Sequence, residues 1–277
     1  MSEIAEDDLA VCVQTLRDTN RGRWLATLLM PASVRTAATV LFGLSAELDA
    51  VVSRTSEPLA GEIRLQWWSD AIAGKRDEEA SGSPLARNVM VLRDAHELPV
   101  PALQALAEGR VAELYADPFP DRTAFEGWAG ETRAATYQLL ALCAFPEEAL
   151  ACATASGHAG VLSAIADTVT ELHRNIDRGF VRLPVDLLAA TGSTREEFLA
   201  DPEKRSAAIT ALIDWGRERE ALFAKALGQL PKPVRALYKP VAIDSLVLRR
   251  AAKMGDELAR RPMHVRQWRQ QLALLFG

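Results

Sequence analysis

The stretch Ala166–Leu188, ADTVTELHRNIDRGFVRLPVDLL, places charged residues at helical intervals just before a glycine. Successive members of the charged set are four, three and four positions apart, so on a continuous helix they lie along one stripe. The set consists of Asp167, Glu171, Arg174 and Arg178. Gly179 then predicts the end of the helix, because glycine is common just beyond helix C-termini.

This charged stripe has three interpretations: a metal and diphosphate site, a site that has lost its chemistry, or a solvated helix face. In the last one, Glu171 pairs with Arg174 and Asn175 while Asp167 meets water. The preceding residues, GHAGVLSAIA (157–166), are small and apolar on nearly every side. Such a segment is typical of a bundle interior, which favours an inward-facing stripe.

Helical periodicity dominates the rest of the chain. Apolar residues recur at intervals of three and four in the segments 7–18, 31–54, 57–74 and 101–116. Pro31, Pro58, Ser83-Pro84 and Val100-Pro101 predict helix starts. The breaks between periodic segments are too short for an interdomain linker. We therefore predict one all-α domain over residues 1–277, a helical bundle around either a cavity or a dry core.

Composition excludes several functional classes. The formal net charge is −5, so no overall positive field is present to recruit nucleic acid or an anionic membrane, and any anion site must be a local cluster. Cys12, Cys143 and Cys152 lack the spacing of metal ligands, and we expect reduced thiols in apolar surroundings. The N-terminal residues are acidic, with no signal-peptide pattern and no uninterrupted apolar run of membrane-spanning length. These features predict a cytoplasmic protein.

Two acidic residues interrupt the apolar segment LFGLSAELDAVVSR (41–54). Glu47 and Asp49 lie about 200° apart on a helix, so at most one shares the direction of the apolar face. A buried carboxylate needs a cation, and Arg35 and Arg54 are candidate partners. In the alternative, Glu47 or Asp49 simply faces solvent.

Four segments in this order resemble the squalene/phytoene synthase family. They are RWLATLLMPASVRTAATVLFGLSAELDAV (23–51), SEPLAGEIRLQWWSDAIAG (56–74), YADPFPDRTAFEGWAGETRAATYQL (115–139) and ELHRNIDRGFVRLPVDLL (171–188). The last contains Arg178-Gly179 and Leu183-Pro184, a combination found in that family. The resemblance implies an isoprenoid-synthase-like all-α bundle around a central cavity. It also implies head-to-head joining of two prenyl diphosphates, with Mg²⁺ ions held by two Asp-rich motifs.

Both motifs are degenerate in this chain. In the first, Asp49 occupies the first position, with Ala50 and Ser53 where further carboxylates are expected. In the second, the equivalent residues are Glu171, Arg174 and Asn175. Asp49 and Glu171 would then be the remaining ligands for Mg²⁺, a cofactor implied only if synthase activity survives.

The resemblance therefore implies a protein that binds a prenyl diphosphate or lipid, with weakened or lost synthase activity. The substrate-binding candidates are Arg35, Asp49, Asp167, Glu171, Arg174 and Arg178, and no catalytic residue is assigned. GEIRLQWW (61–68) and GETRAATYQL (130–139) resemble complex I assembly factors more closely, which implies a respiratory-complex partner and a peripheral position at the inner membrane. The alternatives are an active Mg-dependent prenyl transferase, with Arg174 and Arg178 replacing part of the metal's role, and a scaffold without a ligand site.

Overall fold

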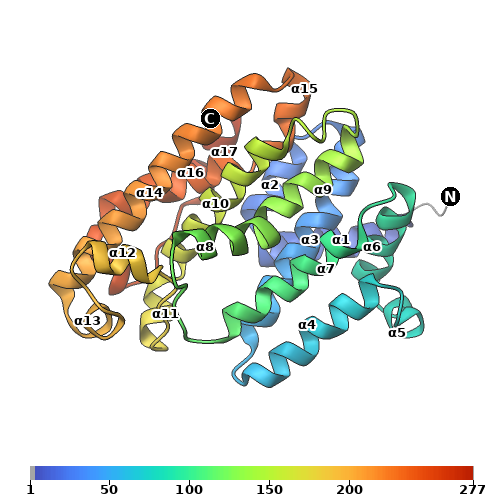
Figure 1. The fold of residues 1–277 in the computed structure, drawn as a ribbon. Coiled ribbons are helices and arrows are strands. Elements are labelled where there is room, and N and C mark those ends of the chain that lie inside the picture. The colour runs from blue at the N-terminus through green and yellow to red at the C-terminus, as the bar shows by residue number, and fades with distance from the viewer. Residues whose placement is uncertain (1–3, 277) are drawn as a thin grey trace.

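Helices form the whole of the described architecture. The structure, a computed structural model, describes residues 4–276, and this range contains no β-strand (Figure 1). The α-helices are α1 (Glu6–Thr19), α2 (Arg21–Leu28), α3 (Ala32–Arg54), α4 (Pro58–Ile72), α5 (Asp77–Ser81), α6 (Pro84–Ala95), α7 (Val100–Glu108), α8 (Arg122–Ala129), α9 (Ala135–Ala144), α10 (Ala153–Thr170), α11 (Leu172–Asp177), α12 (Val185–Ala190), α13 (Arg195–Ala200), α14 (Pro202–Gln229), α15 (Lys232–Arg235), α16 (Val241–Met254) and α17 (Gln267–Phe276). Short 3-10 turns cover Gly109–Leu114, Ala236–Tyr238 and Gly255–Ala259, and a π-helical turn covers Gly130–Ala134.

The predicted helix starts are confirmed, because each predicted proline lies at or beside a helix N-terminus. Pro31 precedes α3, and Pro58 begins α4. Pro84 begins α6, where the Ser83 hydroxyl accepts a hydrogen bond from the backbone N–H of Ala86. This satisfies one of the donors left free in a first helical turn.

Helix α3 is the centre of the N-terminal half of the bundle. Its length and apolar composition would suffice to cross a membrane, but 72% of its most apolar window is buried inside the protein. It packs against α1, α6 and α9. The apolar character of α3 is therefore explained by the core, and its C-terminal half carries Asp49 and Ser53 to the pocket described below.

Helix α10 approaches the π-helical turn Gly130–Ala134 unusually closely. A Cβ atom at Gly160 would lie 2.5 Å from both the backbone nitrogen and the Cβ atom of Ala134. Only glycine permits this approach, since side chains in close-packed interiors do not come so near. The contact holds Arg133, in the same turn, against the face of α10.

The predicted continuous helix over the charged stripe is wrong. Helix α10 ends at Thr170, and Glu171 forms a bend before α11 begins at Leu172. The hydroxyls of Thr168 and Thr170 donate to the backbone carbonyls of Ala164 and Ala166. Such bonds compete with the helical ladder and bend helices, which accounts for a break at this point.

A buried ion pair joins the two halves of the bundle. Arg23 of α2 lies 3.0 Å from Asp244 of α16 and also donates to Tyr137 of α9 and Ser163 of α10. This network fixes α2, whose N-terminus borders the pocket.

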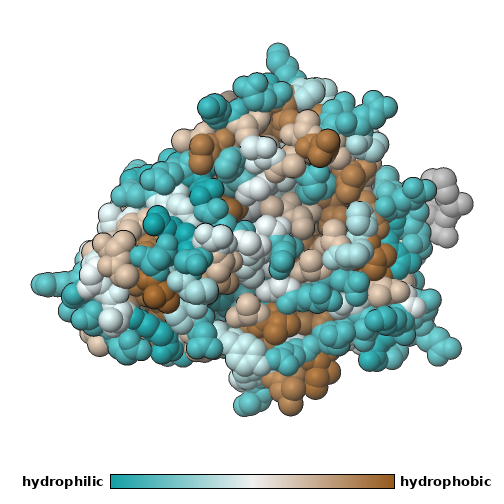
Figure 2. Space-filling model, in the orientation of Figure 1, coloured by the Kyte–Doolittle hydropathy of each residue, from teal (hydrophilic) through white to brown (hydrophobic). Residues whose placement is uncertain are grey.

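On the surface, Figure 2 shows apolar side chains gathered over the start of α4, where Leu59 and Ile63 are exposed.

Candidate functional site

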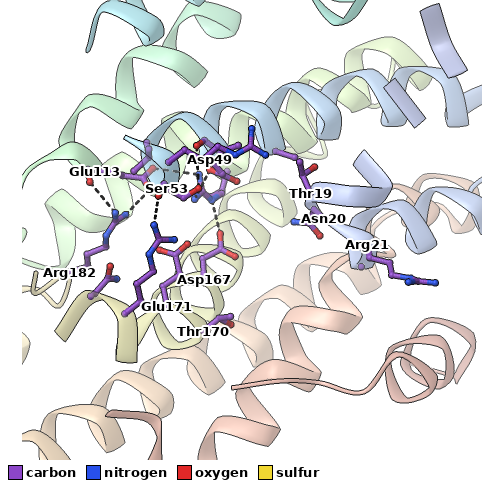
Figure 3. A pocket seen from close by; sticks show the side chains of 18 of the residues that line it. Thr19, Asn20, Arg21, Asp49, Ser53, Glu113, Asp167, Thr170, Glu171 and Arg182 are labelled. Carbon is purple, nitrogen blue, oxygen red and sulfur yellow. Dashed lines mark hydrogen bonds and ion pairs between the residues drawn. The ribbon is translucent and has the colours of Figure 1, made fainter. Parts of the chain in front are cut away.

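A polar pocket of about 640 Å³ opens between the turn before α2, the C-terminal half of α3, and the α10–α11 bend. This volume is typical of small-ligand sites, which span roughly 300–1,000 Å³. The charged residues of its wall are Asp18, Arg21, Asp49, Arg54, Glu113, Arg133, Asp167, Glu171, Arg174, Arg178 and Arg182. Figure 3 shows Asp49, Asp167 and Glu171 converging on this space from two sides.

Five of the six predicted binding residues line this pocket, and Arg35 does not. The five are Asp49, Asp167, Glu171, Arg174 and Arg178. Arg35 is exposed near the start of α3, where its guanidinium donates to the backbone carbonyls of Leu28 and Met30. The structure therefore separates Arg35 from the other candidates.

Asp49 is neutralised by two buried arginines. Its Oδ1 atom lies 2.9 Å from Nε of Arg110 and 3.2 Å from a terminal nitrogen of Arg133. Burial raises the pKa of Asp49, but the two guanidinium groups outweigh burial and hold that pKa below its usual range. The expected partners Arg35 and Arg54 are thus wrong for Asp49. Glu47 instead lies 3.7 Å from Arg64.

Arg133 is the central cation of the site. Its Nε atom donates to Oδ2 of Asp167 at 2.9 Å, so one guanidinium joins the carboxylates of α3 and α10. Only 8% of the Arg133 side chain is exposed. Burial alone would lower its pKa, but Asp49, Glu113 and Asp167 raise it, so the side chain stays charged.

Glu113, which also lines the pocket, completes the buried network. Its carboxylate receives a 2.6 Å hydrogen bond from Arg182 and lies 3.5 Å and 3.8 Å from Arg110 and Arg133. Glu113 and both of these arginines are at most 8% exposed. Removing one member of such a network leaves an uncompensated buried charge, which costs about 3–5 kcal/mol.

Glu171 differs from Asp49, Glu113 and Asp167 because no ion pair within residues 4–276 involves it. Burial raises the pKa of Glu171 to about 7, opposed by Arg182 and reinforced by Asp167. The expected pair between Glu171 and Arg174 is absent. The Arg174 guanidinium instead donates to the backbone carbonyl of Ser53, across the pocket mouth.

Donors without protein partners face the same cavity. Arg54 and Arg178 line it and form no ion pair within the described part of the chain, while Arg178 stacks 4.5 Å from the Phe180 ring. Asn175 is 3% exposed, and its side-chain amide nitrogen has no hydrogen-bond partner. A buried polar group without a partner calls for an explanation, and a bound acceptor oxygen would supply one.

These side chains do not fit a magnesium cluster. Over residues 4–276, no group of three or more His, Cys, Asp or Glu side chains is placed to hold a metal ion. Asp49, one of the two expected ligands, pairs with Arg110 and Arg133, and the same Arg133 guanidinium pairs with Asp167. Mg²⁺ requires near-octahedral oxygen coordination, and guanidinium groups that already pair with these carboxylates oppose it.

Sequence analysis did not identify Arg110, Glu113, Arg133 or Arg182 as site residues. One signal was present, because Arg133 lies among the small residues of the segment GETRAATYQL. The small residues of this segment pack closely, since Ala134 lies against Gly160 of α10. The same close packing brings Arg133 to Asp49 and Asp167.

Comparison of sequences identifies a family over nearly the whole chain. The squalene/phytoene synthase profile matches residues 16–273. The chain is 24% identical to NADH dehydrogenase (ubiquinone) complex I assembly factor 6 of Mus musculus over 188 residues, and of Homo sapiens over 189 residues. Each match covers 68% of this chain and 56% of the relative, so the chain spans little more than half the length of these proteins.

Solved structures share the fold. A dehydrosqualene synthase in complex with a ligand superposes with a TM-score of 0.81 at 15% identity, covering 98% of this chain and 95% of the other. Squalene synthase HpnC from Alicyclobacillus acidocaldarius superposes with a TM-score of 0.71 at 14% identity, covering 93% and 96%. The predicted isoprenoid-synthase-like helical fold is confirmed by these superpositions.

Proposed function

Because the chain belongs to the squalene/phytoene synthase family, we propose that its pocket binds a prenyl diphosphate or a related anionic lipid directly through arginines. In this proposal the pocket needs no magnesium, and head-to-head synthase activity is weakened or lost. A diphosphate carries several acceptor oxygens, and guanidinium groups bind such oxygens with charge-assisted hydrogen bonds.

The observation that carries the proposal is the pairing of Arg133 with both Asp49 and Asp167. The buried Arg133 guanidinium neutralises two carboxylates that would otherwise repel an anion in the pocket. Arg54, Arg178 and the Asn175 amide then remain as donors facing the cavity. Ala46, Ala50 and Val52 supply an apolar wall beside them.

Binding of farnesyl diphosphate, measured by calorimetry in EDTA and in Mg²⁺, tests the proposal. We expect similar affinity in both solutions. Arg178→Gln and Arg54→Gln should each weaken binding about tenfold, since a hydrogen bond to a charged group contributes about 1.5–3 kcal/mol. Arg64→Gln, which removes an exposed arginine outside the pocket, is the matched control.

Product analysis with farnesyl or geranylgeranyl diphosphate and Mg²⁺ separates this proposal from an active transferase. We expect no head-to-head hydrocarbon. Robust turnover that disappears in Asp49→Ala would contradict the proposal and establish the transferase.

We also propose a role in respiratory complex I assembly, at the periphery of the inner membrane. Support comes from the similarity to assembly factor 6, which extends over about two thirds of this chain. Deleting the chain from its host should lower the amount of assembled complex I, and the wild-type chain should restore it. An unchanged level of the intact complex after deletion would remove this role.

A further inference from the structure

Helix α17 has an apolar stripe on the side that faces away from the protein. Its four large apolar residues there are exposed: Trp268 by 51%, Leu272 by 46%, Leu275 by 58% and Phe276 by 83%. Their positions, i, i+4, i+7 and i+8, place them on one helical face. Single exposed apolar residues are common on protein surfaces, whereas a contiguous row of four marks an interaction surface.

The opposite face of α17 is anchored in the protein. Leu274 is 1% exposed and packs in a small core with Leu25, Ala26 and Ile243. Lys239 also donates to the Leu274 carbonyl at 3.2 Å. The helix is therefore fixed along one side, and the outward stripe is held rigidly in place.

The chain around this stripe is strongly basic. Between Arg260 and Phe276 the sequence has four arginines and one histidine and no acidic residue, although the whole chain has a net charge of −5. The basic residues are Arg260, Arg261, His264, Arg266 and Arg269. The net charge of this segment is therefore positive, whereas that of the whole chain is negative.

A basic cavity lies directly beside α17. Its volume is about 240 Å³, and it is lined by Leu246, Arg250, His264, Val265, Arg266 and Arg269. Arg250, Arg266 and Arg269 take part in no ion pair within residues 4–276. Arg269 also lies over the Trp268 ring, 5.2 Å from its centre, so the cavity and the stripe are adjacent.

We propose that α17 and this cavity dock the protein onto an anionic lipid bilayer. The apolar stripe would enter the boundary between head groups and acyl chains, with Trp268 at the level where tryptophan is favoured. The arginines would bind lipid phosphates, because basic residues next to a membrane are attracted to its negative surface. An acidic protein partner or a second copy of the chain would be an alternative occupant.

The apolar patch on α4 provides a matched control. Leu59 and Ile63 are 67% and 65% exposed, but Glu57 and Glu62 flank them. The two patches thus expose similar side chains and differ in charge. An anionic bilayer should bind α17 and leave α4 free.

Co-sedimentation with vesicles tests the proposal. The wild-type chain should sediment with phosphatidylcholine vesicles that contain phosphatidylglycerol, remain in solution with phosphatidylcholine alone, and detach at high salt. Leu272→Gln with Leu275→Gln should lower the partition coefficient about tenfold or more, since each leucine loses its burial in the bilayer. Arg266→Gln with Arg269→Gln should lower it about tenfold on anionic vesicles.

Leu59→Gln with Ile63→Gln should partition like the wild type. The proposal is overturned if the wild type stays in solution with anionic vesicles, or if the α4 and α17 double variants lose binding equally. It is also overturned if the wild type is a dimer that the α17 leucine variant dissociates without any change in sedimentation. Every substituted residue is exposed, so the far-UV circular dichroism spectra of the variants should match that of the wild type. If the leucine variant misfolds, the arginine variant still tests the proposal.

Discussion

Glu171 is a pocket residue whose pKa links the stability of the protein to pH. In the native state burial raises its pKa to about 7, whereas the ordinary value of this side chain is 4.5. Between these two values the unfolded chain loses the proton and the native chain keeps it. The free energy of unfolding therefore falls as pH rises through this window, and the stabilising difference is fully present only below it.

Glu171→Gln removes this titration while keeping the shape of the side chain. We expect the variant to be more stable than the wild type by about 1–2 kcal/mol near pH 8, and equally stable near pH 4. Urea unfolding at the two pH values measures the difference. A difference of the same size at both pH values, or a variant that is less stable near pH 8, would show that burial of a charged Glu171 is not the cause.

The spacing of charges predicted which residues of the stripe share one side, and all four of them line the pocket. It could not predict their partners. Arg133 reaches Asp49 and Asp167 from sequence distances of 84 and 34 residues, and such contacts depend on how helices cross. The roles of these residues in ligand binding stay a prediction.

At the scale of elements, the crossing of α10 with the π-helical turn Gly130–Ala134 positions the central arginine. Periodicity predicted α10 and its apolar surroundings, but neither the π-helical turn nor the bend at Glu171. The π-helical turn lies where Ala134 packs against Gly160, a contact that periodicity does not reveal. The break at Glu171 follows the hydroxyl hydrogen bonds of Thr168 and Thr170, which periodicity does not reveal either.

Gly160→Ala tests this crossing. The added methyl would meet the backbone of Ala134, so we expect a loss of about 1–3 kcal/mol in the free energy of unfolding. Gly157→Ala, one turn earlier on α10, has no atom within 4 Å of the new methyl. That control should be neutral or stabilising by up to about 1 kcal/mol, as expected for alanine in a helix. Equal effects of the two substitutions in chemical denaturation would contradict the close approach.

On the scale of the whole molecule, the all-α bundle and the family followed from four sequence segments in the correct order. The pairing of charges in the pocket did not follow from the sequence. A family resemblance gives the positions of motifs, but it says little about which side chains the residues at those positions contact. Here Arg133 bridges the first-motif residue Asp49 and Asp167, the first carboxylate of the stripe. In this pocket the carboxylates of α3 and α10 thus pair with one buried arginine.

The ratio of farnesyl diphosphate dissociation constants in EDTA and in Mg²⁺ tests this account most directly. A ligand held by arginines should bind with nearly the same affinity in both solutions. We therefore predict dissociation constants within about twofold of each other, which is a difference of less than about 0.5 kcal/mol in binding free energy. A site that needs the metal would bind far more weakly in EDTA. A loss of affinity of about a hundredfold or more on removing Mg²⁺ would contradict the account, whereas tight binding in EDTA that Arg178→Gln weakens would confirm it.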